Sequence, residues 1–192
     1  MKTTVFIDGE NFVHKVEEVL VQSGVEQKKI NLPKIKLQLL LEKVLTSLKI
    51  DEVIFYAAKL HFYKETARKS QQLIDRQRAL KSELEKQKIT FIIAGNVRAQ
   101  TVPGGKTVFK EKGVDVKMAI DMVTQACDRR IKTAIICSSD SDLQPAVYEL
   151  KKRSVETIYL GFETSPNKGL TATTDKSILF RNAEIMGAFK DN

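Results

Sequence analysis

The stretch "TVFIDGENF" (residues 4–12) joins a run of β-branched and aromatic residues to a carboxylate. The apolar residues up to Ile7 are typical of a strand that is buried on both faces, as in the middle of a parallel sheet. Asp8 comes directly after this strand. A charge at the end of a buried strand needs hydrogen-bonding or ionic partners, because burying it without them is costly. The stretch therefore predicts a central strand that delivers a functional carboxylate.

Four more apolar runs follow, and helix-like segments separate them. The runs are short, rich in valine, isoleucine and aromatic residues, and lack strict in-and-out alternation, so both faces of the sheet should be covered. We therefore expect an α/β fold with three layers, a mainly parallel central sheet and right-handed crossovers. The expected strands are 3–7, 52–58, 89–94, 132–139 and 155–162, and the expected helices are 10–22, 33–48, about 63–87, about 114–129 and 141–152.

The chain contains no internal repeat and no Ser/Gly-rich linker, so we expect a single domain over residues 1–192. Its one glycine-rich break is "PGGK" (103–106), which indicates a hairpin tip or a mobile loop. Near the C-terminus, "SILFRN" (177–182) is a candidate for a final short strand.

The formal net charge of +8 is concentrated in one segment. Residues 59–112 contain 13 Lys/Arg against 5 Asp/Glu, whereas the segments on either side each contain equal numbers of the two signs. A one-sided basic segment favours a polyanionic partner, most often a nucleic acid. The alternative is that these charges only solvate a helix face.

Several other classes of protein are disfavoured. The two cysteines, Cys127 and Cys137, lack the spacing of a metal site, and both are expected to be small buried residues. No apolar run reaches membrane-spanning length and the N-terminus has no signal-peptide core, so we expect a cytoplasmic protein with no membrane partner. No Gly-rich phosphate loop, Ser-His-Asp set or GxSxG motif is present.

Acidic residues follow two of the expected strands and begin one of the expected helices. Asp8 ends the first strand, and Asp140 and Asp142 follow the fourth in "CSSDSDLQP". The helix before the fourth strand must begin at the same sheet edge, and "KGVDVKMAIDMV" places Asp115 at that point. Because ligands of open α/β sheets bind outside the carboxyl ends of the strands, we expect these carboxylates to form a cluster.

Each of these acids alone is explained as a helix cap, because Asp readily accepts hydrogen bonds from free backbone N–H groups. Several together repel one another unless a cation neutralises them. Mg²⁺ prefers a few carboxylates together with waters and substrate phosphates, so the cluster predicts a Mg²⁺ or Mn²⁺ site. Asn11 can add a neutral oxygen, and Ser138 and Ser139 can hydrogen-bond the acids or the substrate.

Two more acids and both histidines have weaker signals. Asp121 is turned about 240° from Asp115 around the helix and lies roughly 9 Å further along it, so the spacing places it on another face. Glu10 either supports the site from behind or only favours the helix dipole. His14 and His61 lie far apart in the sequence and are expected to be ordinary surface or half-buried residues.

The blocks "FIDGENF", "KGVDVKMAIDMV" and "CSSDSDLQP" resemble the three signature blocks of the NYN domain, also called LabA-like, in the PIN-like nuclease superfamily. They stand in the family's order and, with the strands around them, span residues 4 to about 162. The resemblance implies a Rossmann-like (PIN-like) fold with sheet order 3-2-1-4-5 and a metal-dependent ribonuclease site. The residues that match the blocks are Asp8, Asn11, Asp115, Asp121, Asp140 and Asp142.

We therefore expect a Mg²⁺- or Mn²⁺-dependent ribonuclease that hydrolyses RNA phosphodiester bonds. The expected catalytic residues are Asp8, Asp115, Asp140 and Asp142, of which the first three bind the metal, and Asn11, Asp121 and Ser139 are secondary. Ser139 and Leu143 stand where the family often has Gly and Phe, but neither difference removes a carboxylate. One alternative is a non-catalytic RNA-binding or regulatory module with the same fold. Another is a phosphohydrolase or a topoisomerase-primase-like domain.

RNA is the expected partner, in single-stranded form, because aromatic residues of the basic segment can stack on unpaired bases. We expect residues 98–113 to clamp the RNA, since this stretch leads directly into Asp115 at the acidic edge. The sequence leaves open whether the chain forms a homo-oligomer. The expected nucleic-acid contacts are Arg98, Lys106, Lys110 and Lys112.

Overall fold

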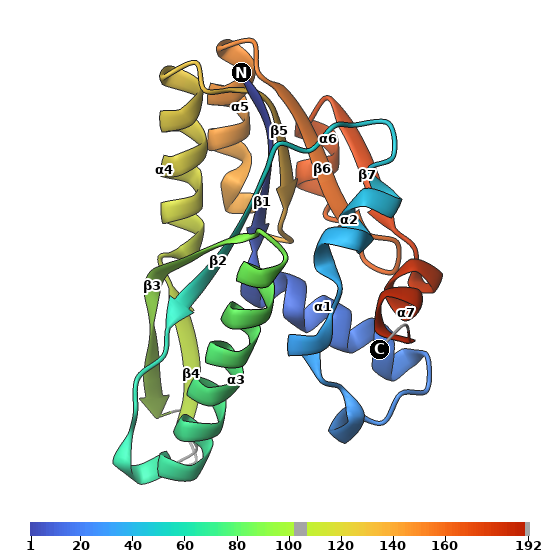
Figure 1. Cartoon of the computed structure of the whole chain (residues 1–192). Coiled ribbons are helices and arrows are strands. Elements are labelled where there is room, and N and C mark those ends of the chain that lie inside the picture. Colours follow the sequence, from blue (N-terminus) through green and yellow to red (C-terminus); the bar gives the residue numbers. More distant parts are fainter. Residues whose placement is uncertain (102–106, 191–192) are drawn as a thin grey trace.

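In the computed structural model, which describes residues 1–101 and 107–190, one sheet runs through the middle and helices cover both of its faces (Figure 1). Within this part the sheet has seven strands in the order β4-β3-β2-β1-β5-β6-β7. Neighbours pair in parallel except β3 and β4, which are antiparallel. The strands are β1 (Lys2–Asp8), β2 (Glu52–Lys59), β3 (Thr90–Thr101), β4 (Thr107–Lys112), β5 (Ile131–Cys137), β6 (Glu156–Phe162) and β7 (Lys176–Phe180).

The predicted fold class and core strand order are confirmed. When the antiparallel strand β4 is left out and the parallel strands are renumbered along the chain, β5, β6 and β7 become the fourth, fifth and sixth strands. The order is then 3-2-1-4-5-6, which contains the expected order 3-2-1-4-5 and adds β7 at the end. β4 has no clear strand pattern in the sequence, because "TVFKEK" mixes apolar and charged side chains, and the hairpin tip proposed at "PGGK" was its one indication. The "PGGK" segment lies outside the described residues, although the strands on either side of it pair with each other.

Helices divide between the two faces of the sheet, as Figure 1 shows. One face carries α1 (Gly9–Gln22), α2 (Leu37–Val44), α3 (Ala67–Lys86) and α7 (Asn182–Lys190), and the other carries α4 (Val114–Cys127), α5 (Gln144–Lys152) and α6 (Lys168–Thr173). Short 3₁₀ turns occur at η1 (Gln27–Lys29), η2 (Leu32–Lys34), η3 (Lys64–Thr66) and η4 (Ser141–Leu143). Among the described helices, none combines the length and the apolar composition that crossing a bilayer requires.

Three helices differ from the sequence-based expectation. The helix expected over 33–48 begins only at Leu37, because Pro33 lies in the preceding 3₁₀ turn η2. The helices α6 and α7 were not expected at all. The first has only 6 residues, too few to display a helical hydrophobic period.

Side chains of β1 alternate between two apolar clusters, one on each face of the sheet. Val5 and Ile7 face the cluster under α1, whereas Phe6 faces the cluster under α4. Cys137 is buried as predicted, and burial raises the pKa of its thiol. The prediction for Cys127 was wrong, since this residue is exposed at the last position of α4, where Arg153 Nε donates to its Sγ atom at 3.1 Å.

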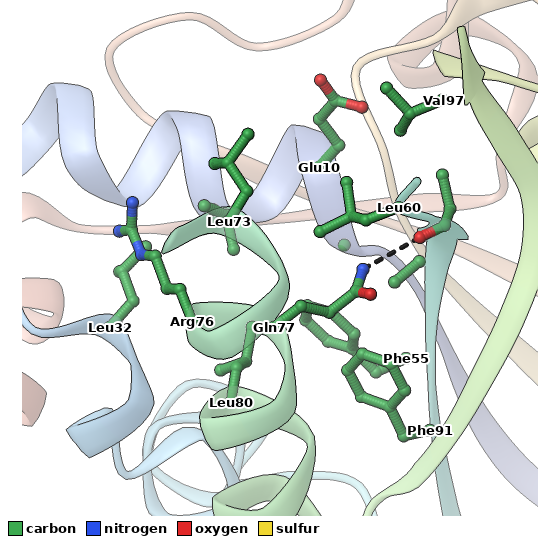
Figure 2. Close-up of a pocket in the computed structure, with 14 residues that line it drawn as sticks. Glu10, Leu32, Phe55, Leu60, Leu73, Arg76, Gln77, Leu80, Phe91 and Val97 are labelled. Atoms are coloured by element: carbon green, nitrogen blue, oxygen red, sulfur yellow. Dashed lines mark hydrogen bonds between the residues drawn. The ribbon is translucent and has the colours of Figure 1, made fainter. Parts of the chain in front are cut away.

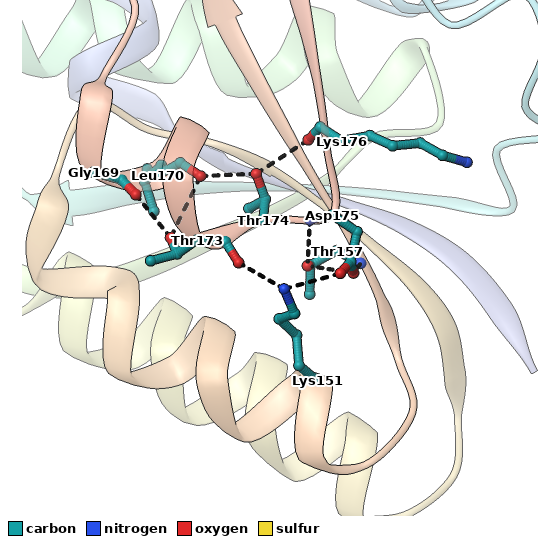
Figure 3. Close-up of polar contacts among 8 residues, drawn as sticks. All are labelled: Lys151, Thr157, Gly169, Leu170, Thr173, Thr174, Asp175 and Lys176. Carbon is teal, nitrogen blue, oxygen red and sulfur yellow. Dashed lines mark hydrogen bonds and ion pairs between the residues drawn. The ribbon is translucent and has the colours of Figure 1, made fainter.

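A polar network fixes β7 to the rest of the sheet (Figure 3). The Asp175 carboxylate accepts hydrogen bonds from the backbone N–H and the hydroxyl of Thr157, both at 2.8 Å. Lys151 pairs with Asp175 at 3.0 Å and also donates to the carbonyl oxygen of Thr173. These contacts, chiefly the backbone hydrogen bond, lower the pKa of Asp175. The network therefore holds the end of α6 and the start of β7 against β6.

Candidate active site

Asp8 is the last residue of β1 and the N-cap of α1. Its Oδ1 atom accepts from the Asn11 backbone N–H at 3.1 Å, and its Oδ2 atom accepts from Asn11 Nδ2 at 2.5 Å and from the Ser138 hydroxyl at 3.3 Å. Asp8 is only 4% exposed, and burial raises the pKa of this carboxyl although the hydrogen bonds act in the opposite direction. Among the described side chains no lysine or arginine pairs with it. The strand thus ends on a carboxylate that only neutral groups hold.

Gly9 allows α1 to begin directly against β2. A Cβ atom at this position would lie 2.3 Å from Cε1 of Phe55 and 2.4 Å from the carbonyl oxygen of Tyr56. Tyr56 is the partner of Asp8 in the β1–β2 register, so the obstruction is backbone that cannot rotate away. Glycine is therefore what lets the chain turn into α1 immediately after Asp8.

The turn after β5 is tied to the start of α1. Ser139 donates its hydroxyl hydrogen to Oδ1 of Asn11, and the Ser138 oxygen accepts from the backbone N–H of Asp140 at 3.1 Å. Asp140 caps η4, because its Oδ1 atom accepts from the Asp142 backbone N–H at 2.8 Å. Hydrogen bonds therefore connect Asp8 to Asp140 through Ser138, while Ser139 ties the same turn to Asn11.

Asp115 reaches the same edge from the other side of the sheet. It lies in the first turn of α4, and Gly113, which has φ 92°, caps this helix directly after β4. Val114 and Met118 are buried and fix the helix on the sheet, while Asp115 is half-buried. An open hollow of about 600 Å³ results, here called the acidic hollow. Its lining residues are Asp8, Glu10, Asn11, His14, Lys112, Gly113, Asp115, Val116 and Asp140.

The arrangement of these residues can be compared with known proteins. The NYN domain model matches residues 2–180. The chain belongs to the NYN domain family. The resemblance inferred from the three sequence blocks is thereby confirmed, and it places this NYN domain in the PIN-like nuclease superfamily.

Solved structures support the fold of this NYN domain. The crystal structure of a protein of unknown function from Vibrio parahaemolyticus is similar over 93% of this chain and 92% of that chain, with a TM-score of 0.51 and 13% sequence identity. At 13% sequence identity, this similarity supports a shared fold only. No curated protein matches the chain.

Two predicted acids of this NYN domain do not line the acidic hollow. Asp142 is exposed, and the contact described for it is the backbone hydrogen bond to Asp140. Asp121 accepts from the Tyr56 hydroxyl at 3.1 Å and pairs with Lys117 at 2.5 Å, which agrees with its expected place on another face of α4. The structure therefore brings Asp8, Asp115 and Asp140 to one hollow and leaves Asp121 and Asp142 outside it.

The expected nucleic-acid contacts are only partly described. Lys112 is exposed and lines the acidic hollow. Arg98 and Lys110 are cross-strand partners in the β3–β4 hairpin, but their side chains, like the whole of Lys106, lie outside the described part of the structure. Of the four expected nucleic-acid contacts, Lys112 is thus the one whose described side chain lines the same hollow as the carboxylates.

Three residues at or beside the acidic hollow were not predicted as site residues from the sequence. Glu10 and His14 line the acidic hollow from the first turns of α1. Asn167 was missed altogether: its Nδ2 atom donates to the Ser139 carbonyl oxygen at 2.8 Å, and its Oδ1 atom caps α6. The preference of Asn for N-caps was the signal available for Asn167, but the short helix behind it gave no pattern to cap.

The donors around the acidic hollow suit a hard divalent cation. Within residues 1–101 and 107–190, no three His, Cys, Asp or Glu side chains stand close enough to hold one metal ion as placed. The chemistry of the donor set nevertheless fits Mg²⁺ or Mn²⁺, which prefer carboxylate and amide oxygens. The buried Asp8 carboxylate, which has no cationic side chain as a partner, is the group that such an ion would satisfy.

Proposed function

We propose that this NYN domain is a metal-dependent ribonuclease that hydrolyses RNA phosphodiester bonds at the acidic hollow. The observation that carries the proposal is the environment of Asp8, a carboxylate that is 4% exposed, has only neutral hydrogen-bond partners among the described residues and shares a hollow with Asp115 and Asp140. Buried charge of one sign is costly without a counter-ion. Membership of a family within the PIN-like nuclease superfamily supports a hydrolase that acts on nucleic acid.

Asp8, Asp115 and Asp140 would hold Mg²⁺ or Mn²⁺, and Asn11 would contribute a neutral oxygen. When bound, such an ion supplies a Lewis acid that activates water and stabilises negative charge on the phosphate. The protein's own part is to fix the carboxylates. Asn11 and Ser138 orient Asp8 by direct hydrogen bonds, and Ser139 holds Asn11 in turn.

Lys112 provides the cationic side of the same hollow. Lys112 is exposed and lines the acidic hollow together with Asp115, so its ammonium group would pair with a phosphate oxygen while the carboxylates hold the cation. We extend this role to Arg98, Lys106 and Lys110 of the hairpin segment, which would follow the RNA backbone away from the scissile bond. Fixed cations of this kind raise RNA affinity and make it dependent on salt.

Metal addition and removal test the proposal. We expect the purified chain to cleave labelled single-stranded RNA in Mg²⁺ or Mn²⁺, to stop in excess EDTA, and to resume when the metal is restored. Cleavage that continues undiminished in EDTA would contradict the metal dependence. Binding of RNA without cleavage in every divalent ion would instead support the second candidate, a non-catalytic RNA-binding module.

The two acids of "SSDSD" should differ in importance. Asp140 lines the acidic hollow, whereas Asp142 is exposed outside it, so Asp140→Asn should lower the cleavage rate by about tenfold more than Asp142→Asn. Both substitutions preserve the shape of the side chain, and in Asp140→Asn the amide oxygen can still accept from the Asp142 backbone N–H at η4. The comparison needs single-turnover cleavage rates at saturating Mg²⁺. A greater loss in Asp142→Asn would show that the roles of these residues are reversed.

A further inference from the structure

A second hollow lies against the first turn of α1 (Figure 2). It encloses about 230 Å³ between α1, α3 and the ends of β2 and β3, and we call it the apolar pocket. Phe55 and Phe91 are buried at its base, where their rings stack with centroids 5.4 Å apart and planes 20° apart. Leu60, Leu73 and Val97 form much of its wall. Glu10 lines both hollows, so the two are neighbours at the start of α1.

We propose that the apolar pocket receives one unpaired nucleobase of the RNA, next to the phosphate that lies in the acidic hollow. The choice of RNA rests on the proposed function, and the assignment of the pocket rests on its own geometry. Its volume is below the roughly 300–1,000 Å³ of sites for drug-sized ligands, which suits a single planar ring system. Enzymes and RNA-binding proteins hold extruded bases between apolar and aromatic side chains in this manner.

Polar groups at the mouth of the pocket can read the edge of a base. Gln77 donates its Nε2 hydrogen to the Ala58 carbonyl oxygen at 2.9 Å, which fixes the amide and leaves its Oε1 atom as an acceptor (Figure 2). The Glu10 carboxylate is a second acceptor at the same mouth. Two acceptors select for N–H donors on the base. The pocket should therefore favour adenine, cytosine or guanine, whose exocyclic amino group offers two N–H hydrogens, over uracil, which has one N–H donor between two carbonyl oxygens on its pairing edge.

The wall formed by α3 gives the RNA backbone a favourable path out of the pocket. This helix carries exposed basic side chains at Arg68 and Arg78, and it belongs to the segment that contains the whole net charge of the chain. Arg76, which lines the pocket, is itself held by an ion pair with Glu17 on α1. An apolar pocket between a carboxylate site and a basic helix matches a nucleotide, which combines an aromatic ring with an anion.

A pair of neighbouring substitutions tests the proposal. Leu73→Trp places a large ring in the pocket, whereas Gln72→Trp places the same ring on the exposed side of α3, outside the pocket lining. Affinities would be measured by fluorescence anisotropy in EDTA, for a six-nucleotide RNA and for versions with an abasic site at each position in turn. We expect one abasic position to weaken wild-type binding by about fivefold or more. Leu73→Trp should weaken binding of the intact RNA by the same factor, and the abasic site should then cause no further loss of affinity. Gln72→Trp should bind the intact and the abasic RNAs as wild type does.

A second readout needs no substitution. Methyl NMR signals of Leu60, Leu73, Leu80 and Val97 should shift on titration with cytidine monophosphate and stay unmoved with ribose 5-phosphate. Wild-type affinity in Leu73→Trp, equal losses at all abasic positions, or unmoved methyl signals would overturn the assignment of the pocket. These measurements are made without divalent metal, so they test base binding separately from cleavage. The pocket assignment can be refuted while Mg²⁺-dependent cleavage is observed, and it can be supported while no cleavage is observed.

Discussion

Asp8→Asn is expected to lower RNA cleavage by about 100-fold or more, because it removes the buried charge around which the proposed metal site is built. Asparagine keeps the size of the side chain, and its oxygen can still accept from the Asn11 backbone N–H, so α1 should still be capped. The unfolding temperature without metal should equal or exceed that of wild type, since an ionised carboxylate no longer has to be buried.

Cleavage rates and thermal unfolding should be measured together for this variant. In wild type, Mg²⁺ should raise the unfolding temperature because it binds the folded state, and in Asp8→Asn this increase should be small or absent. Asp128→Asn is the matched control, since Asp128 is exposed at the far end of α4. Cleavage by Asp8→Asn within a few-fold of wild type at low Mg²⁺ would refute the assigned role of Asp8.

Gly9→Ala is expected to lower the free energy of unfolding by about 3 kcal/mol, the upper end of the range for overpacked sites. The added methyl group meets the Tyr56 carbonyl oxygen at 2.4 Å, and backbone in the middle of the sheet cannot move without disturbing the β1–β2 pairing. Cleavage should fall as well, because Asp8 would shift together with the start of α1. Urea denaturation monitored by circular dichroism measures the change in stability.

Gly187→Ala provides the comparison for this variant. Gly187 lies in α7 with no atom within 4 Å of the added Cβ position, so alanine there should be neutral or stabilising by up to about 1 kcal/mol. If Gly9→Ala were as stable as Gly187→Ala, the close approach of α1 to β2 would not be required for the fold.

Topology explains why much of the site could be predicted from the sequence. Parallel strands end at one edge, so the residues after β1 and β5 and the first turn of α4 have to meet there, whatever the details of packing. This reasoning located Asp8, Asp115 and Asp140, but it also placed Asp142 in the cluster, and the structure leaves Asp142 outside the acidic hollow. The hydrogen bonds that tie Asn11 to Ser139 and Asn167 to the same turn could not be predicted, because they depend on side-chain directions in irregular loops.

The apolar pocket was also beyond sequence reasoning. Most of its apolar residues belong to β2, β3, α1 or α3 and look like ordinary core residues of those elements, so nothing in the sequence distinguishes a lining residue from a packed one. The pocket depends on how far α3 lies from β2, β3 and α1, and that distance is set by the summed packing of all four elements. Likewise, β4 follows from its pairing with β3 and not from a strong strand signal of its own.

The junction between β4 and α4 limits how the length of this chain can vary. Only Gly113 separates Lys112, the last residue of β4, from Val114, the first residue of α4, and Lys112 is fixed in register opposite Asn96. One inserted residue here would rotate the start of the helix by about 100° and turn Asp115 away from the hollow. Insertions at the far end of the β3–β4 hairpin leave this junction unchanged. Engineered insertions should therefore avoid this junction, where a single inserted residue next to Gly113 would turn Asp115 away from the acidic hollow.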